Sequence, residues 1–550
     1  MRFRTQLKGF ESSEKDRITQ LTGTIRTDVL ILGAGMAGLT CALALPEEID
    51  ILLVSKVPIP TGSTYLAQGG LAAAISEDDS FQLHLRDTIL AGGGLVDEEV
   101  AINIIESGPR LVNQLSEWGA FLEGACGSGK GGIEGGHSVR RVLHHKDRTG
   151  RLISEVLCDR CRERKNISIL QPAFAVNLLT ASREMPDLVE NAIDRCLGAH
   201  ILHDSRISTV LAGETIIATG GAGKVYRYTS NQDSATGDGI AMAYRAGLPI
   251  RNMEFYQFHP TCLFHPEKRN FLITEALRGE GARLLNLEGQ RFMENYDPQR
   301  MELAPRDVVA RAIDSEMKRL GNDHVLLDAT HLGREKLEES FPEITEGVTS
   351  VGIIPWLEPI PVVPAAHYCV GGIDASADGS TAMNGLRAIG EASCTGFHGA
   401  NRLGSNSLLE AGVMGLKAAD SIPDTVLNPD IFSARDWTYG RAEPLKENVL
   451  VDYAWAALRN VMWDYVSIVR SDRKLHRALR IIDVLADEIE EDYWSLLPTV
   501  ELLELRNICT VSRAIVRSAL RRRESRGLHY TLDCPGQKQL ARDTILKIQL

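Results

Sequence analysis

A short apolar segment near the N-terminus is followed by glycines and then by a second apolar segment with a different period. Residues 27–32 form a β-branched apolar run that predicts a strand, and residues 39–45 predict a helix that ends at Pro46. Residues 49–54 predict a second buried strand. The order strand, glycine turn, helix, strand is typical of a βαβ unit that binds a dinucleotide.

The turn between this first strand and the helix reads GAGMAG over residues 33–38. Gly33 would permit the tight turn, Gly35 would let the backbone approach a pyrophosphate, and Gly38 would let the helix pack closely on the sheet. Free N–H groups at the start of the helix would bind the phosphates. The alternative is a βαβ unit without a ligand.

The residues after the second strand argue against NAD as that ligand. An acid at this point would bind the ribose of NAD, but Ser55 and Lys56 stand there instead. These two residues would contact a flavin nucleotide without the carboxylate–ribose hydrogen bond, or they simply end the strand.

Later glycine-edged strands predict that the nucleotide-binding unit is discontinuous. The strand at 215–217 precedes a second glycine cluster, and residues 385–391 repeat the strand-and-turn pattern. Beyond residue 431, apolar residues recur at helical spacing and predict a three-helix bundle. We therefore expect an α/β fold with a flexible extension (1–26), a Rossmann-like domain (27–252 and 369–430), an inserted α+β capping domain (253–368) and a C-terminal helical domain (431–550).

Composition restricts the class of protein. The 550 residues carry 60 Lys and Arg against 73 Asp and Glu, and this net charge of −13 argues against a nucleic-acid partner. We expect no membrane partner, because no run of 18 apolar residues occurs. Residues 1–26 lack an apolar signal segment, so the expected location is the cytoplasm. The single CxxC at 158–161 predicts reduced thiols, and no metal site is expected.

His and Arg residues recur among glycines and other small residues. Any one His is more often a hydrogen-bonded core residue than a catalyst, but the concentration of these clusters favours a functional site. Arg binds carboxylates through a planar fork, and His adds directional donors. A dicarboxylate pocket would explain how an acidic chain takes an anionic ligand. The clusters lie at 134–141, 257–261, 274–281, 306–307, 366–368 and 398–407.

These segments resemble the flavoprotein family of succinate dehydrogenase and fumarate reductase, and within it most closely the L-aspartate oxidases. The resemblance extends from about residue 27 to residue 535. It rests on the motifs GSTYLAQGG (62–70), EGGHS (134–138), EFYQFHPT (254–261), TEALRGEG (274–281), LAPRDVVARA (303–312), VPAAHY (363–368), GEASCTGFHGANRLGSNSLLEAG (390–412) and RRESRGLHY (522–530).

The resemblance implies FAD as the cofactor. Ser63 stands where relatives in membrane complexes attach FAD through a His, so binding should be noncovalent. A helix that starts near Ser405 would direct its positive end at the flavin and favour its reduction. The residues expected to contact FAD are Gly33, Ala34, Gly35, Met36, Ala37, Gly38, Ser55, Lys56, Ser63, Thr64, Tyr65, Leu66, Ala67, Gln68, Gly69, Gly70, Asp238, Glu391, Ser407 and Leu408.

The resemblance also implies a reaction. L-Aspartate would be oxidised to iminoaspartate, with dioxygen or fumarate as electron acceptor, as the first step of quinolinate and NAD biosynthesis. Transient delivery of the imine to a quinolinate synthase is plausible. Arg306 would lie beside the reacting carbons, with Glu275 and Arg278 in the polar network around it. The carboxylates would be held by His259, His367 and Arg402, with a hydroxyl from Thr274. The identity of a proton acceptor stays open, because the pKa of Arg exceeds 12.

Glu134 would discriminate between substrates. A carboxylate facing the ammonium of aspartate forms a charge-assisted pair, whereas beside succinate it would repel a dianion. The alternative is a surface Glu in the glycine-rich loop 127–136. Two other functions stay open: a flavoprotein subunit of a succinate or fumarate complex, and a nucleotide-binding or interaction protein without catalysis.

Overall fold

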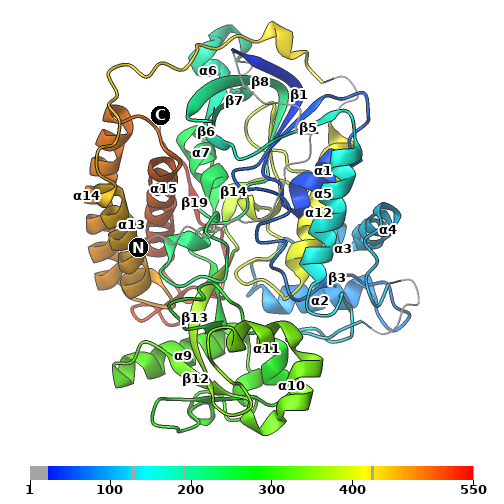
Figure 1. The fold of residues 1–550 in the computed structure, drawn as a ribbon, viewed down its shortest axis with the longest axis vertical. Helices are drawn as coiled ribbons and strands as arrows, with labels where there is room; N and C mark the ends of the chain where they lie inside the picture. Colours follow the sequence, from blue (N-terminus) through cyan, green and yellow to red (C-terminus); the bar gives the residue numbers. More distant parts are fainter. Residues whose placement is uncertain (1–22, 126–130, 190–192, 423–425, 549–550) are drawn as a thin grey trace.

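The computed structural model describes residues 23–125, 131–189, 193–422 and 426–548. A seven-stranded sheet forms the centre of the upper part in Figure 1, in the order β5-β2-β1-β8-β7-β6, with β15 also paired to β8. The pairs among β5, β2, β1, β8 and β15 are parallel, whereas β6 and β7 are antiparallel additions. The strands are β1 (Ile25–Leu32), β2 (Ile51–Val54), β5 (Ile167–Leu170), β6 (Phe174–Thr180), β7 (Cys196–His203), β8 (Arg206–Ile217) and β15 (Leu386–Ala388).

The predicted βαβ unit is present. Helix α1 (Met36–Ala44) connects β1 to β2 and packs against α12 (Asn406–Ser421). The approach is close, because a Cβ atom added at Gly415 of α12 would lie 2.7 Å from the Ala37 carbonyl oxygen. β1 begins at Ile25, two residues before the predicted strand. Most of the predicted extension, residues 1–22, lies outside the described residues.

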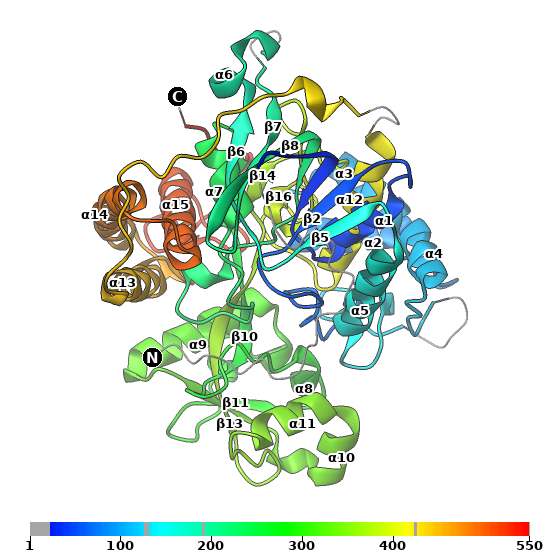
Figure 2. The same cartoon turned by 45° about the horizontal axis from the view of Figure 1, so that its top comes forward.

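A second sheet lies in the lower lobe of Figures 1 and 2, in the order β10-β13-β12-β11. This lobe has its own apolar core, which includes Phe292, Ile313 and Val362. Apart from Cys369, the last residue of β13, its helices and strands fall within residues 253–368, which we retain as the proposed limits of the capping domain. Its elements are β10 (Tyr256–Leu263), α8 (Glu275–Gly279), β11 (Arg283–Leu285), α9 (Arg306–Leu320), β12 (Val325–Asp328), α10 (Arg334–Ser340), α11 (Pro342–Thr349) and β13 (Ile360–Cys369).

Three helices pack beside the central sheet and complete the α/β architecture predicted from the sequence. They are α13 (Val449–Val466), α14 (Asp472–Ser495) and α15 (Val500–Arg521), and α15 lies against α7 (Asp238–Arg245). The last two begin where the side chains of Ser471 and Thr499 cap their N-termini. Among the helices in the described ranges, none combines the length and the apolar character needed to cross a membrane.

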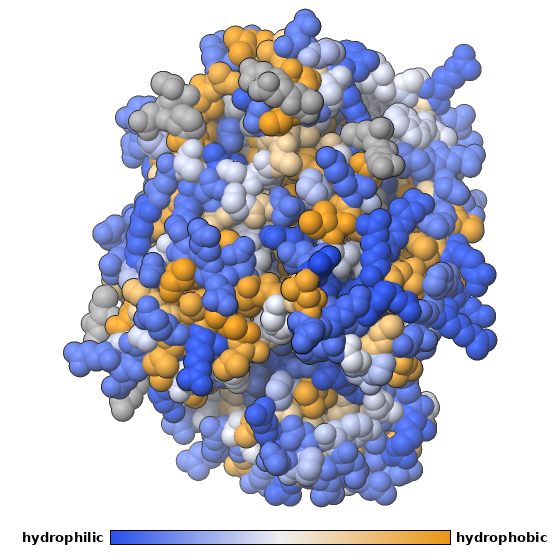
Figure 3. Space-filling view, turned by 180° about the vertical axis from the view of Figure 1, so that it is seen from behind, coloured by the Kyte–Doolittle hydropathy of each residue, from blue (hydrophilic) through white to orange (hydrophobic). Residues whose placement is uncertain are grey.

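The remaining elements surround these three parts. The face in Figure 3 is mostly hydrophilic, with separate apolar patches, and it is hollowed where the lower lobe meets the rest of the molecule. The other helices and strands are β3 (Leu71–Ala72), α2 (Phe81–Ala91), α3 (Glu98–Glu106), α4 (Gly108–Trp118), β4 (Val142–Leu143), α5 (Thr149–Glu163), α6 (Ala181–Glu184), β9 (Ile250–Arg251), β14 (Gly372–Asp374), β16 (Ser393–Cys394), β17 (Val469–Arg470), β18 (Tyr530–Thr531) and β19 (Ile545–Leu546).

Candidate active site

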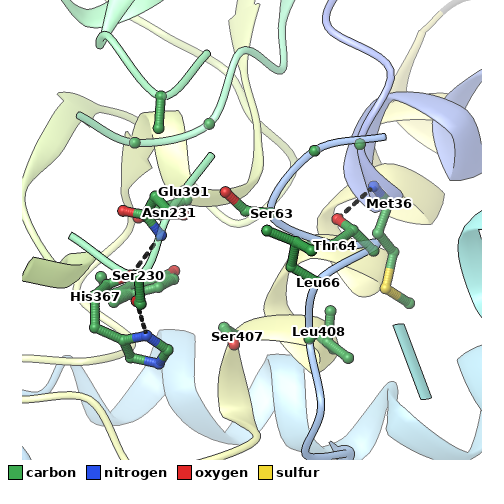
Figure 4. Close-up of a pocket in the computed structure, with 18 of the residues that line it drawn as sticks. Met36, Ser63, Thr64, Leu66, Ser230, Asn231, His367, Glu391, Ser407 and Leu408 are labelled. Atoms are coloured by element: carbon green, nitrogen blue, oxygen red, sulfur yellow. Dashed lines mark hydrogen bonds between the residues drawn. The ribbon is translucent and has the colours of Figure 1, made fainter. Parts of the chain in front are cut away.

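A cavity of about 670 Å³ lies between the central sheet and the lower lobe. It opens at the carboxyl ends of β1, β2 and β8, the edge at which open α/β sheets bind ligands. Figure 4 shows side chains from distant segments converging on it, among them Thr64, His367 and Ser407. Every residue that the sequence predicts for the site lines this cavity, except Gly38, Tyr65 and Arg278.

The glycine turn has the geometry of a phosphate-binding loop. Gly33 has a φ of +118°, and a Cβ atom there would lie 2.2 Å from the Ala218 carbonyl oxygen, so only glycine fits. Gly35 precedes α1, and its added Cβ would meet only the Thr64 hydroxyl, at 3.4 Å. The N-terminus of α1 is therefore open to the cavity and available to an anion.

Gly38 and Tyr65 lie just outside the lining. A Cβ atom at Gly38 would lie 2.1 Å from the Gly33 carbonyl oxygen, so this glycine serves the close packing of α1 on the turn. The Tyr65 ring instead faces the guanidinium of Arg151, at 5.6 Å from its centroid. Neither side-chain position touches the cavity.

Charged residues meet at the end of the cavity nearest β2. The Lys56 ammonium lies 2.7 Å from Asp238 Oδ2 and 2.9 Å from Glu504 Oε1 of α15. Burial opposes the charge of Lys56, but the two carboxylates outweigh it and raise the pKa of the ammonium. The C-terminal bundle thus helps to fix a cation beside the glycine turn.

Two imidazoles lie side by side at the opposite end, with ring centroids 5.5 Å apart. His367 Nδ1 is 2.8 Å from the Ser230 hydroxyl, and Asn231 donates to the His367 carbonyl oxygen, as Figure 4 shows. Burial and neighbouring arginines lower the pKa of His367 and of His259 well below the usual value. Both rings are therefore neutral hydrogen-bonding groups at physiological pH.

Arg402 is held on three sides. Its guanidinium lies 4.6 Å from the centroid of the Tyr368 ring, Nη2 donates to Gln257 Oε1 at 2.8 Å, and Nη1 donates to the Ser407 hydroxyl at 2.8 Å. Burial, with Arg306 nearby, lowers the pKa of Arg402 to about 10. The group stays charged at neutral pH, in a fixed orientation.

Arg306 forms an ion pair at the start of α9, where Nε donates to Glu275 Oε2 at 2.6 Å. Arg278 Nη2 lies 3.8 Å from the same Glu275 oxygen. Burial opposes the charge of Arg306, but Glu275 and Glu134 raise its pKa above the ordinary value. Burial likewise opposes ionisation of Glu275, but Arg306 and Arg278 lower its pKa. The pair is therefore ionised inside the cavity.

The Glu134 carboxylate points into the cavity between two glycines. A Cβ atom at Gly69 would lie 2.7 Å from Oε1, and one at Gly404 would lie 2.4 Å from Oε2. The Ser405 hydroxyl donates to Oε2 at 2.9 Å. The small residues of the two family-like motifs thus leave the space that this acid fills, and the surface position considered for it is not observed. Residues 126–130 of its loop lie outside the described residues.

A buried ion-pair network anchors the loop that carries Glu134. Arg141 donates two hydrogen bonds to Asp79, both at 2.9 Å, and one to Asp87 at 2.6 Å. Asp87 also accepts from the backbone N–H and hydroxyl of Ser138, both at 2.8 Å. The side chains of Arg141 and Asp79 are fully buried, so the base of the loop is rigidly held.

Arg141→Met is expected to reduce the free energy of unfolding by about 3–5 kcal/mol, because it leaves two buried carboxylates without their cation. Chemical denaturation measures this change. The matched control is Arg110→Met, which breaks a half-exposed pair with Asp420 and should cost about 1 kcal/mol or less. Equal losses in the two variants would contradict the buried network.

Two lining residues, Ser230 and Asn231, orient His367 but stand in no predicted glycine turn or cluster. Gln257, which begins the predicted cluster at 257–261, orients Arg402 from outside the lining. Gln257 lies inside the motif at 254–261, so the sequence identified the segment that contains it but not its role. Glu391, which was predicted, accepts from the Cys369 N–H at 2.9 Å, and burial raises its pKa to about 7.

Comparison with known proteins identifies two family regions. An FAD binding domain matches residues 28–408, and a fumarate reductase flavoprotein C-terminal domain matches residues 455–544. The chain is 46% identical over 528 residues to L-aspartate oxidase of Yersinia pestis, covering 94% of this chain and 98% of that protein. It is 41% identical over 540 residues to a chloroplastic L-aspartate oxidase of Oryza sativa, covering 92% and 82%.

Solved structures share the fold over nearly the whole chain. The E. coli quinol fumarate reductase FrdA superimposes with a TM-score of 0.83 at 31% identity, covering 95% of this chain and 94% of that chain. Mycobacterium smegmatis Sdh1 superimposes with a TM-score of 0.78 at 28% identity, covering 96% and 94%.

Proposed function

The chain belongs to the L-aspartate oxidase family of FAD-binding flavoproteins, and from this premise we propose that it oxidises L-aspartate to iminoaspartate. The observation that carries the proposal is the Glu134 carboxylate, which faces the cavity beside Arg306 and between two glycines. An acid in this position matches the amino group of aspartate, which succinate and fumarate lack.

The cations and imidazoles hold the two substrate carboxylates. Arg402 and Arg306 offer guanidinium forks, and His259 and His367 offer neutral ring nitrogens, with the Thr274 hydroxyl lining the same wall. Two points of attachment fix a four-carbon diacid in one orientation, and the Glu134 carboxylate then selects the substrate whose Cα bears nitrogen. Oxidation removes a hydride from that Cα and a proton from the nitrogen, which leaves the imine.

The glycine turn fits FAD. Gly35 leaves the start of α1 open to a pyrophosphate, and Lys56 provides a cation close by. The N-terminus of α12, at Asn406, has no side-chain cap and reaches the cavity through Ser407 and Leu408. FAD, when bound, supplies the two-electron acceptor. Ser63 lines the cavity, and its hydroxyl offers no nucleophilic ring nitrogen, which supports noncovalent binding.

Gly35→Ala is expected to lower FAD affinity at least 10-fold while leaving the apoprotein folded. The new methyl group meets only the Thr64 hydroxyl inside the protein, but it fills space that a pyrophosphate would occupy. Flavin fluorescence titration measures the affinity, and circular dichroism reports folding. Gly412→Ala is the contrasting variant, because its methyl would lie 2.6 Å from Leu111 in the apolar core and should destabilise the fold instead. Undiminished affinity in Gly35→Ala would contradict a pyrophosphate at the turn.

Arg402→Ala is expected to lower kcat/KM for L-aspartate about 30-fold, equivalent to about 2 kcal/mol of lost binding. The loss should appear mainly in KM, because this guanidinium anchors a carboxylate in both ground and transition states. Steady-state kinetics measures it. Near wild-type turnover at low substrate would overturn the assignment of Arg402.

The experiment that tests the proposed function is an anaerobic titration of the holoenzyme. L-Aspartate should bleach the oxidised-flavin absorbance, whereas succinate and D-aspartate in parallel should leave it nearly unchanged. An oxidised spectrum that persists with L-aspartate would refute the function. Stronger bleaching by succinate would favour the second candidate, a flavoprotein subunit of a succinate or fumarate complex, which the similarity to fumarate reductase suggests.

Dioxygen or fumarate is the proposed final electron acceptor, and the fumarate-reductase-like fold supports the second. We also propose quinolinate synthase as a transient partner. Iminoaspartate hydrolyses in water, and rapid transfer to the next enzyme would limit that loss. The cytoplasm is the proposed location. Free thiols support it, since the cysteines of the described ranges form no disulfide among themselves.

A further inference from the structure

A second cavity has a volume of about 290 Å³. Residues from β6, α6, α7, α14 and α15 line it, and Figure 2 shows α7 between the sheet and the last two helices. Three of the seven lining residues are arginines, and within the described part of the chain none is acidic. They are Asn177, Arg183, Arg245, Tyr493, Trp494, Arg506 and Ile548.

Arg245 is a partly buried cation that has no carboxylate within ion-pair distance in the described structure. Its Nη1 donates to Asn507 Oδ1 at 2.9 Å and its Nη2 to the Val176 carbonyl oxygen at 3.5 Å, while Nε has no hydrogen-bond partner. Burial, followed by the neighbouring Arg506, lowers its pKa to about 9. Glu490 and Asp238 favour the charged form of Arg245, but neither forms an ion pair with it.

The neighbouring groups hold this cation in place but do not neutralise it. Arg506 gives both Nε and Nη2 to Glu490 and lies 3.7 Å from the centroid of the Tyr493 ring, so that carboxylate is already used. Asn507, which accepts from Arg245, donates at 2.9 Å to Asp238 and is therefore fixed from its other side. The cavity is therefore lined by a positive charge that is held in one position.

Arg183 adds a second guanidinium group to the lining of the cavity. It belongs to α6, its side chain is exposed, and it lines the cavity that Arg245 lines from within. We propose that this cavity binds a small multivalent oxyanion, either inorganic phosphate or a phosphate monoester, between the guanidinium groups of Arg183 and Arg245. Planar guanidinium forks match the oxygens of a tetrahedral oxyanion, and a cavity of about 290 Å³ has room for such a group and a few waters.

Calorimetric titration of the holoenzyme with inorganic phosphate, at constant ionic strength, tests the site. Saturable binding at concentrations up to about 10 mM is expected, with an affinity that falls at least 10-fold in Arg183→Gln. This residue is exposed, so its variant should fold normally, and Arg245→Gln should show the larger loss. Arg160→Gln is the matched control, because that exposed arginine pairs with Glu163 away from the cavity.

Arg402→Gln separates this site from the active site. Phosphate binding that survives in Arg402→Gln but weakens in Arg183→Gln supports the proposal, independently of whether the enzyme oxidises aspartate. Loss in Arg402→Gln alone, or no saturable binding by wild type, would overturn it. A parallel titration with adenosine monophosphate identifies the source. Tighter binding than phosphate, with a change in Trp494 fluorescence, assigns a monoester, and equal affinity assigns phosphate itself.

Discussion

Arg306→Met is expected to lower kcat/KM for L-aspartate about 1,000-fold, equivalent to about 4 kcal/mol of transition-state stabilisation. The variant removes the guanidinium that lies between Glu275 and Glu134. Two carboxylates would then face a dianionic substrate without the cation that separates them. The loss should appear in kcat as well as in KM, because charge that develops near the reacting carbon loses its stabilising partner.

Steady-state kinetics and flavin content measure this result. Arg306→Lys retains the charge but not the fork, and it should recover only part of the activity. Arg319→Met is the matched control on the same helix, because its half-exposed guanidinium pairs with the buried Glu316 away from the cavity. An Arg306→Met enzyme that keeps its flavin and at least a tenth of the wild-type kcat/KM would remove Arg306 from the reaction.

The secondary structure around the glycine turn was predictable because it depends on local pattern. The βαβ unit consists of a buried β-branched strand, a glycine turn and a helix that ends before Pro46, and all three lie within about thirty residues. Each can be identified from its own short segment, and the confirmed fold class follows from that unit. The three C-terminal helices were predictable for the same reason, since each shows an apolar face at helical spacing. FAD was predictable as the cofactor from the family resemblance and this turn together.

The contacts between distant segments were not predictable in this way. The Lys56 ammonium bonds to Glu504, which is 448 positions later in the chain, and no periodicity links the two. Ser230 orients His367 from a loop without a motif. Such pairs arise from tertiary packing, which a single sequence does not record. The second cavity was missed for the same reason, because its arginines come from separate helices.

The space around Glu134 shows what a motif can and cannot convey. The sequence placed Gly69, Gly404 and Ser405 in two family-like motifs, but not as the walls around one carboxylate. Glycine is needed at both positions, because an added Cβ atom would clash with an oxygen of the Glu134 carboxylate. The position of the Glu134 carboxylate therefore depends on both glycines as well as on its own loop. A larger residue at either glycine should displace the acid.

Glu134→Gln is expected to lower kcat/KM for L-aspartate about 100-fold, which corresponds to about 2.7 kcal/mol. Glutamine has the same shape, so it fits between the glycines and still accepts from the Ser405 hydroxyl. What it lacks is the negative charge that pairs with the substrate ammonium. Removing one partner of such a desolvated charge pair typically costs about 2–5 kcal/mol.

A comparison with succinate tests whether the lost charge, rather than a change in shape, causes the effect. A neutral amide no longer repels a dianion, so the preference for aspartate over succinate should shrink by a larger factor than the loss of aspartate activity alone. Kinetics with both substrates measures the ratio, and Glu123→Gln, a half-exposed acid on the same loop region, is the control. If both substrates lose activity equally, Glu134 shapes the pocket but does not recognise the substrate amino group. The assignment of aspartate as substrate then rests on the family relationship alone.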